Sequence, residues 1–271
     1  MSKVLFDALE DALATAAVDA KLDKVRALAA AWQGGGLRYA PSSAPAPETT
    51  RRGYPERPLL VSPRRVPRRS PASPAGLAAL FHAIAHIEWS AIDLALDHAY
   101  RFRACPAAYY GDWIGVAAEE VAHFEMLRAH LRGLGHDYGD FPAHDGLWTL
   151  AVATAHDALA RMALIPRLME ARGLDATPPI QARLEAVGDL EGVKMLDVVL
   201  RDEVGHVALG DRWFRHLCTQ RGLEPEAEFR RLIDAYGAPW PAAPMNEKAR
   251  REAGFGADEL RILAGQCRPA M

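Results

Sequence analysis

Two glutamate–histidine pairs are the residues of this sequence whose types and spacing point most directly to chemistry. Glu120 and His123 form one pair, Glu203 and His206 form the other, and the two members of each pair are three positions apart. On a helix with about 3.6 residues per turn, this spacing places both side chains on one face. A carboxylate and an imidazole can then bind the same metal ion, so each pair predicts part of a metal site.

Two single glutamates extend this pattern. Glu88 lies 32 residues before Glu120, and Glu170 lies 33 residues before Glu203. Each interval fits two antiparallel helices and a turn that bring the residues to one level. Four buried carboxylates require positive charge nearby, and carboxylates with imidazoles and without thiolates suit iron or manganese. We therefore predict two metal ions, both iron, both manganese or one of each, with the ligands Glu88, Glu120, His123, Glu170, Glu203 and His206.

Two further acidic residues directly precede the paired glutamates and point about 100° around the helix from them. Glu119 is placed to accept the outer N–H of His206, and Asp202 to accept that of His123. Such a hydrogen bond would determine which ring nitrogen binds the metal. The alternative is that each acidic residue makes an ordinary salt bridge with an arginine, and both interpretations stay open.

The remaining histidines and acids near Glu88 favour structural roles. His82 and His86 are four positions apart, but His86 lies about 200° around the helix from Glu88. We interpret these histidines as hydrogen-bonding groups at the surface or between helices. Asp93 and Asp97 are expected to cap a helix or to pair with Arg101.

Helical periodicity of the apolar residues predicts an all-α fold in which four long helices carry the ligands. Pro166 is expected to kink or bulge the third helix. Glu170 would then lie near the C-terminus of that helix, where the macrodipole disfavours a negative charge and a metal ion would offset it. We expect these helices over about 74–102, 106–133, 146–173 and 178–222.

Sequence on either side of these helices predicts three further segments. An amphipathic helix over about 3–32 ends before three consecutive glycines, and short helices follow residue 222. Between the first helix and residue 74 lies a proline-rich arm that is expected to be extended. The expected segments are an N-terminal helix (1–36), the arm (37–73), the four-helix bundle (74–222) and a C-terminal helical extension (223–271).

Arginines recur along the arm. They either form a strip that contacts phosphates or lie in solvent and pair with acidic helix faces. We favour the second interpretation, because the only aromatic residue among them is Tyr54. The arginines in question are Arg51, Arg52, Arg57, Arg64, Arg65, Arg68 and Arg69.

Composition indicates the class of protein. The chain has 271 residues, 50% of them hydrophobic, and a net charge of −3, so the whole molecule lacks the strong positive field of a nucleic-acid-binding protein. Cys105, Cys218 and Cys267 are far apart and indicate a reducing compartment. No signal-peptide core follows Met1, and no apolar stretch long enough to span a membrane is expected. We therefore expect a cytoplasmic protein without a membrane partner.

At the six predicted ligands the chain resembles the ferritin-like di-iron superfamily of four-helix bundles. Residues 82–88 (HAIAHIE), 138–148 (YGDFPAHDGLW) and 202–207 (DEVGHV) resemble a bacterial family of ferritin-like proteins classed as a domain of unknown function. This likeness runs from about Arg52 to the C-terminal helices. The ligand pattern is also similar to that of the tRNA hydroxylase of the superfamily.

The resemblance implies dioxygen chemistry at two irons. The expected function is an O₂-dependent oxidase or oxygenase that acts on a small molecule or on RNA. The alternatives are a ferroxidase or iron-handling protein, an RNA-modifying hydroxylase, and a non-catalytic helical protein that its metal ions stabilise. The sequence determines neither the substrate nor the oligomeric state, for which a homodimer is one candidate.

Overall fold

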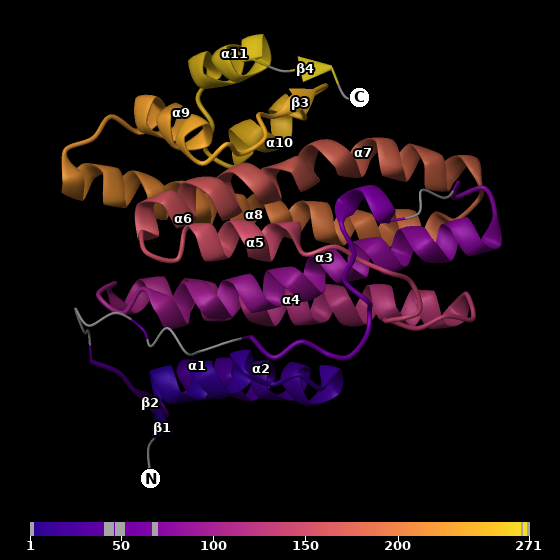
Figure 1. Cartoon of the computed structure of the whole chain (residues 1–271), viewed down its shortest axis with the longest axis horizontal. Coiled ribbons are helices and arrows are strands. Elements are labelled where there is room, and N and C mark those ends of the chain that lie inside the picture. The colour runs from indigo at the N-terminus through magenta and orange to yellow at the C-terminus, as the bar shows by residue number, and fades with distance from the viewer. Residues whose placement is uncertain (1–2, 41–45, 47–51, 67–69, 267, 270–271) are drawn as a thin grey trace. The chain divides into compact units, whose positions relative to one another are not determined.

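The computed structural model consists mainly of helices, as the sequence predicts. It describes residues 3–40, 46, 52–66, 70–266 and 268–269, and the only strands among them are two parallel pairs of two residues each. The chain forms two compact units, Met1–Trp148 and Thr149–Met271 (Figure 1). The expected division into an N-terminal helix, an arm, a bundle and an extension stays a prediction.

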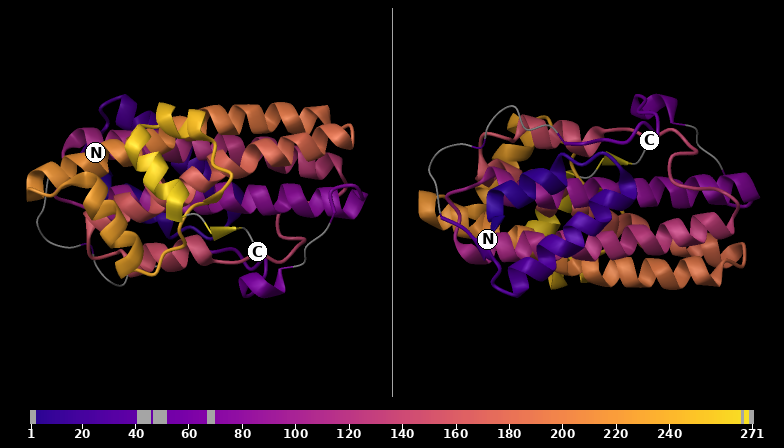
Figure 2. Two further views of the ribbon diagram at one scale, coloured as in Figure 1. Left: turned by 90° about the horizontal axis from the view of Figure 1, so that it is seen from above. Right: turned by 90° about the horizontal axis from the view of Figure 1, so that it is seen from below.

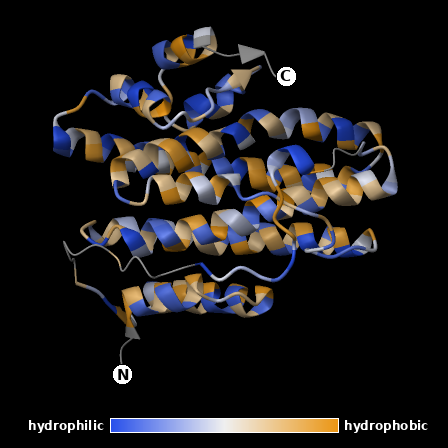
Figure 3. Cartoon of the chain, in the orientation of Figure 1, coloured by the Kyte–Doolittle hydropathy of each residue, from blue (hydrophilic) through white to orange (hydrophobic). Residues whose placement is uncertain are grey.

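The first unit is built around two long helices that pack along each other, α3 (Pro74–Arg101) and α4 (Ala107–Gly133). Both agree with the predicted bounds, because their start signals are local. Ser73 accepts a hydrogen bond from the Gly76 N–H, Pro74 occupies the first turn of α3, and Pro106 precedes α4. Hydrophobic residues occur along the length of both helices (Figure 3).

Helix α3 is also the one helix among the described residues that is long and apolar enough to cross a membrane. Its most apolar 18-residue window has a mean hydropathy of 1.3, and 67% of that window is buried in the structure. The expectation that no such stretch exists was therefore wrong. A buried core helix passes the same test, so the finding by itself does not indicate a membrane.

Two shorter helices cover α3 and α4 where the sequence predicted a single one. Helix α1 (Leu5–Leu13) packs on α3, and α2 (Val18–Gln33) packs on α4 (Figure 2). The break between them lets each helix follow its own partner, and no glycine or proline in the sequence marks it. Next to these helices, strand β1 (Lys3–Val4) pairs with β2 (Leu37–Arg38).

The described part of the proline-rich arm is packed. It contains a short 3₁₀ turn, η1 (Pro63–Arg65), and it forms backbone hydrogen bonds with the connection that follows α4. The Ala143 N–H donates to the Leu59 carbonyl at 3.0 Å, and the Val61 N–H donates to the Ala143 carbonyl at 2.8 Å. The arm is thus part of the first unit.

Arg52 shows how the arm uses an arginine. Its side chain is only 6% exposed, forms an ion pair with Asp145, and approaches Asp93 to 3.8 Å. For this residue, pairing with acidic groups is confirmed. Of the other arginines, Arg57, Arg64 and Arg65 are exposed, and Arg51, Arg68 and Arg69 lie outside the described residues.

The second unit is organised around α8 (Leu190–Arg221), against which most of its other helices pack. Helix α5 (Gly146–Ala153) leads into this unit. Pro166 lies in a π-helical segment, η2, so the predicted bulge is confirmed. The other helices are α6 (Ala158–Leu164), η2 (Ile165–Glu170), α7 (Ala171–Ala186), α9 (Pro225–Ala235), α10 (Glu247–Glu252) and α11 (Ala257–Gln266).

The predicted end of the third helix at Gly173 and the predicted start of the fourth at Pro178 were wrong. Helix α7 continues through both Pro178 and Pro179. The first proline leaves the Leu174 carbonyl without its usual helical donor, and the Asn246 side-chain amide donates to it at 3.2 Å. The turn comes later, where Gly188 adopts φ +81° and the Asp189 carboxylate accepts the Gly192 N–H.

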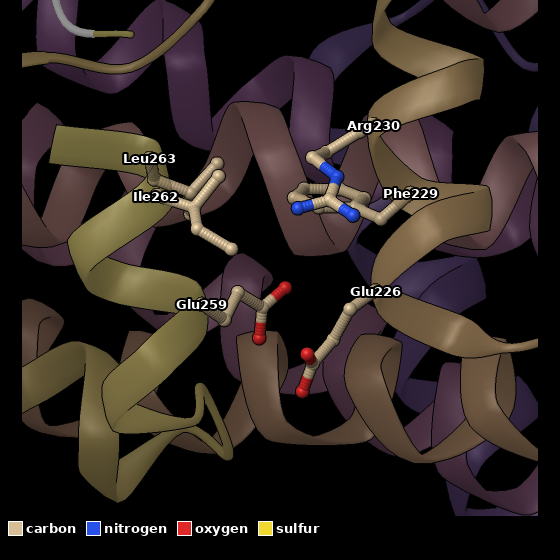
Figure 4. A pocket seen from close by; sticks show the side chains of 6 residues that line it. All are labelled: Glu226, Phe229, Arg230, Glu259, Ile262 and Leu263. Carbon is tan, nitrogen blue, oxygen red and sulfur yellow. The ribbon is translucent and has the colours of Figure 1, made fainter. Parts of the chain in front are cut away.

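Short helices follow residue 222, as predicted, and strand β3 (Ala242–Ala243) pairs with β4 (Arg268–Pro269). Helices α9 and α11 face each other across a hollow in which the Glu226 and Glu259 carboxylates approach one another (Figure 4). No predicted metal ligand lines it. The lining residues are Glu226, Phe229, Arg230, Glu259, Ile262 and Leu263.

Candidate functional site

Three predicted ligands come together within the first unit, where α3 carries Glu88 and α4 carries Glu120 and His123. Each offers a ligand atom, and these atoms lie within 4.8 Å of one another. His123 Nδ1 is 3.3 Å from Glu120 Oε2 and 3.7 Å from Glu88 Oε2. All three side chains are buried, with Glu120 fully inaccessible. We call Glu88, Glu120 and His123 the α3–α4 triad.

Electrostatics show that the triad is short of positive charge. Burial and the neighbouring Glu120 raise the pKa of Glu88 to about 8. Burial opposes protonation of His123, but the hydrogen bond to Glu120 and the negative charges of Glu120 and Glu88 outweigh it and raise the His123 pKa to about 11. Without a metal ion, bound protons therefore supply the positive charge that two buried carboxylates require.

The donor atoms of the triad fit a divalent metal ion. Glu88 Oε2 is buried and accepts no hydrogen bond from the residues that the structure describes. A buried carboxylate oxygen of this kind is costly unless a cation or a proton satisfies it. Two carboxylates and one imidazole, with no thiolate, are ligands that iron and manganese accept.

The other three predicted ligands belong to the second unit. Glu203 and His206 lie one turn apart on α8, and His206 Nδ1 is 3.4 Å from Glu203 Oε1. Glu170 is the last residue of η2, which packs against α8. Its predicted position near a helix C-terminus was wrong, because α7 continues for 16 residues. The argument from the helix macrodipole therefore does not apply to Glu170.

The proposed partners of the ligand histidines stay predictions, because they pair residues of different units. Asp202 forms an ion pair with its neighbour Arg201, with Arg201 Nε 2.8 Å from Asp202 Oδ1. This contact agrees with the alternative of an ordinary salt bridge. Glu119 lies on α4 directly before the ligand Glu120.

The structure also places the other polar residues of α3. Arg101 pairs with Asp97, as predicted, whereas the buried Asp93 pairs with Lys21 of α2. Sequence reasoning missed this second pair because residues 21 and 93 are too far apart for any local signal to link them.

His82 and His86 lie outside the triad and bind the connection that follows α4. His82 Nε2 accepts the Gly139 N–H at 3.0 Å, and His86 Nδ1 lies 2.9 Å from the Tyr138 hydroxyl. Burial is the main cause that lowers the pKa of both histidines to about 4. The sequence analysis did not single out Tyr138. Its signal was that Tyr138 lies in residues 138–148, one of the runs that carry the resemblance to a known family.

Raising the pH from about 7 to about 9 is expected to lower the unfolding free energy of the metal-free protein. The folded-state pKa values of Glu88 (about 8) and His123 (about 11) exceed the ordinary values of 4.5 and 6.5. In this range the unfolded chain therefore releases protons that the folded chain keeps, and stability falls as pH rises. We expect a loss greater than about 1.4 kcal/mol, the equivalent of one pKa unit.

Urea unfolding at several pH values in the presence of a chelator measures this effect. The range begins at about pH 7 because His82 and His86, whose pKa values are lowered, act in the opposite direction below the ordinary histidine pKa of 6.5. The variant Glu88→Gln should show a smaller slope up to about pH 8. A stability that is constant or rises over this range would contradict the charge assignment.

Comparison with known proteins extends over most of the chain. Residues 14–261 match the family described as "Protein of unknown function (DUF455)", a match that begins well before the expected start near Arg52. The chain is 47% identical over 221 residues to an uncharacterized protein of Haemophilus influenzae, and the match covers 79% of this chain and 77% of that protein. No solved structure matches the chain. The chain therefore belongs to the DUF455 family of proteins of unknown function.

Proposed function

We propose that this protein is a carboxylate-bridged dimetal protein that uses dioxygen to oxidise an organic substrate. The observation that carries the proposal is the α3–α4 triad, in which two buried carboxylates and an imidazole present ligand atoms within 4.8 Å of one another. The metals are two iron ions, with manganese or a mixed pair as alternatives. The proposed ligands are Glu88, Glu120, His123, Glu170, Glu203 and His206.

The second part of the proposal is that the ligands meet in a ferritin-like four-helix bundle. Its support is that the same arrangement occurs twice in the chain. Helices α3 and α4 pack together and carry Glu88 and the Glu120–His123 pair. In the second unit, η2 and α8 pack together and carry Glu170 and the Glu203–His206 pair. The intervals of 32 and 33 residues are consistent with two antiparallel helix pairs.

When bound, the metal ions would supply the electrons that reduce dioxygen. Glu88 and Glu120 would bind as carboxylates and His123 through a nitrogen lone pair, so metal uptake should release the protons that the triad holds. The Trp89 and Phe124 rings, 5.4 Å apart between centroids, directly follow Glu88 and His123 in the sequence. Both rings are fully buried, so the parts of α3 and α4 that carry Glu88 and His123 include large apolar side chains that exclude water.

The substrate stays a prediction, either a small molecule or RNA. Arg52 makes buried contacts with acidic residues, which removes it from any strip of arginines available for phosphate. Arg64 and Arg65 are exposed. The arm therefore offers little support for RNA over a small molecule. The cytoplasmic location is likewise still a prediction.

Metal analysis and dioxygen uptake test the proposal. Protein purified from its native host should contain about two irons per chain, the content of the di-iron sites whose ligand pattern it shares. After anaerobic reduction, mixing with O₂ should consume O₂ and change the absorption spectrum, and chelator-treated protein should do neither. If metal removal changes only stability, while O₂ and reductant cause no spectral change, the site is structural. A large hollow oligomer in solution scattering would instead indicate iron storage.

A further inference from the structure

A second group of residues near the α3–α4 triad has the features of a redox-active site. Its centre is Tyr138, which lies in the connection between α4 and α5 and is 9% exposed. The Tyr138 hydroxyl oxygen is 2.9 Å from His86 Nδ1. All residues of this group belong to the first unit.

The hydrogen bonds of His86 determine which group donates and which accepts in its contact with Tyr138. His86 Nε2 lies 3.1 Å from the backbone carbonyl oxygen of His144, which can only accept, so Nε2 carries a proton. An imidazolium at this site would be a buried cation whose two ring hydrogen bonds both go to neutral groups, which is unfavourable. In the neutral ring Nδ1 carries a lone pair, and the Tyr138 hydroxyl donates to it.

A phenol that donates to a neutral imidazole can lose an electron without becoming a cation itself, because its proton passes to the imidazole in the same step. When one electron leaves Tyr138, the phenol becomes a strong acid and its O–H bond breaks. The proton then forms an N–H bond at His86 Nδ1, across the existing hydrogen bond. The products are a neutral tyrosyl radical and an imidazolium, and the electron reduces the oxidant. The Tyr138 oxygen and His86 Nδ1 do not have to move far, because the hydrogen bond between them is already in place.

Ring contacts connect Tyr138 with the residues that follow the triad ligands. The centroid of the Tyr138 ring is 5.8 Å from that of Trp89 and 5.0 Å from that of Phe124. Trp89 follows Glu88, and Phe124 follows His123. This step rests on the proposed function: residues directly next to two ligands of the proposed dimetal centre contact Tyr138 through their rings.

The surroundings of Trp89 and Tyr54 explain why the oxidised state would reside on Tyr138. Trp89 Nε1 makes no hydrogen bond to a described residue, and the Lys21 ammonium lies 5.0 Å from the Trp89 ring centroid. A Trp89 cation radical would lack a proton acceptor and face a positive charge. Tyr54 donates its own hydroxyl to the Pro58 carbonyl at 3.3 Å, and the Arg52 guanidinium lies over its ring. A carbonyl oxygen is a poor proton acceptor, so Tyr54 lacks the base that Tyr138 has.

We propose that Tyr138 is a redox-active tyrosine and that His86 accepts its proton. The site would take a one-electron oxidant, either the oxidised dimetal centre or a small external oxidant. Its role would be to store one oxidising equivalent, or to carry it away from the triad when no substrate is bound.

Photo-oxidation of the full-length protein tests this proposal without depending on a bound metal. A ruthenium tris(bipyridine) complex with persulfate as electron acceptor serves as the external oxidant, and electron paramagnetic resonance detects the radical. The native chain should give a long-lived neutral tyrosyl radical, and Tyr138→Phe should reduce its yield at least about tenfold. The matched control Tyr54→Phe should retain it. His86→Gln, which keeps Tyr138 but removes the base, should shorten the radical lifetime at least about tenfold.

Several outcomes would overturn the proposal. They are the absence of a long-lived radical in the native chain, an undiminished radical in Tyr138→Phe, or an unchanged lifetime in His86→Gln. Circular dichroism and thermal unfolding establish that each variant folds. The radical is generated by an external oxidant, so it should form even in protein that proves to bind no iron. Failure of the dimetal proposal can thus be distinguished from failure of this one.

Discussion

Replacing Glu120 with alanine is expected to weaken iron or manganese binding by more than about 100-fold. Loss of a residue that only orients a ligand costs up to about 100-fold, and Glu120 is proposed to be a ligand itself. Glu120 is fully buried, and its Oε2 atom lies 3.3 Å from His123 Nδ1. The substitution removes a ligand and also the group that orients His123. Titration of the metal-free protein with Fe²⁺ or Mn²⁺ under anaerobic conditions measures the change.

A surface glutamate on the same helix serves as the matched control. Glu125 is 44% exposed and forms an ion pair with Arg26, so Glu125→Ala should leave metal binding unchanged. Equal affinity in Glu120→Ala and the native protein would remove Glu120 from the metal site. The metal-free Glu120→Ala protein should also fold, because the substitution removes one of two buried carboxylates that share His123.

Replacing Arg167 with methionine is expected to destabilise the second unit by about 3–5 kcal/mol, the usual cost of breaking a buried ion pair by removing one partner. Arg167 is fully buried. Its Nε donates to Asp211 at 2.6 Å, and its Nη2 donates to Glu259 at 2.7 Å. The guanidinium carbon also lies 4.1 Å from the Phe229 ring centroid and 4.4 Å from that of Phe255. Methionine would leave two carboxylates without their buried partner and remove the cation from these rings.

Amide hydrogen exchange measures this loss within the second unit alone. Exchange in α8 and α11 should be at least about 100-fold faster in Arg167→Met, because 1.4 kcal/mol corresponds to about tenfold. Arg215 provides a matched control, since it binds the same Asp211 carboxylate at 2.9 Å and approaches Glu259 to 3.7 Å, but is 34% exposed. The effect of Arg215→Met should stay within about 1 kcal/mol. Similar losses of stability in the two variants would show that the burial of Arg167 does not cause the large effect.

The sequence by itself determined the features that depend on nearby residues. Helices α3 and α4 begin within one residue of the predicted positions 74 and 106, because capping and proline geometry act within one turn. The pairing of Glu120 with His123 on one face follows in the same way from the helical repeat. The bulge at Pro166 is local too, because a proline cannot donate the helical hydrogen bond.

The tertiary structure alone decided the features that depend on distant residues. Helix α7 continues through Pro178 because the Asn246 amide, 72 residues away from Leu174, supplies the missing donor. Lys21 pairs with Asp93, 72 residues away in the sequence, and Tyr138 contacts His86, 52 residues away. Such contacts form only when the chain folds back on itself, since the stabilising partner is absent from the local sequence. For this reason the Glu-x-x-His pairs were visible in the sequence, whereas the contact of Tyr138 with His86 was not.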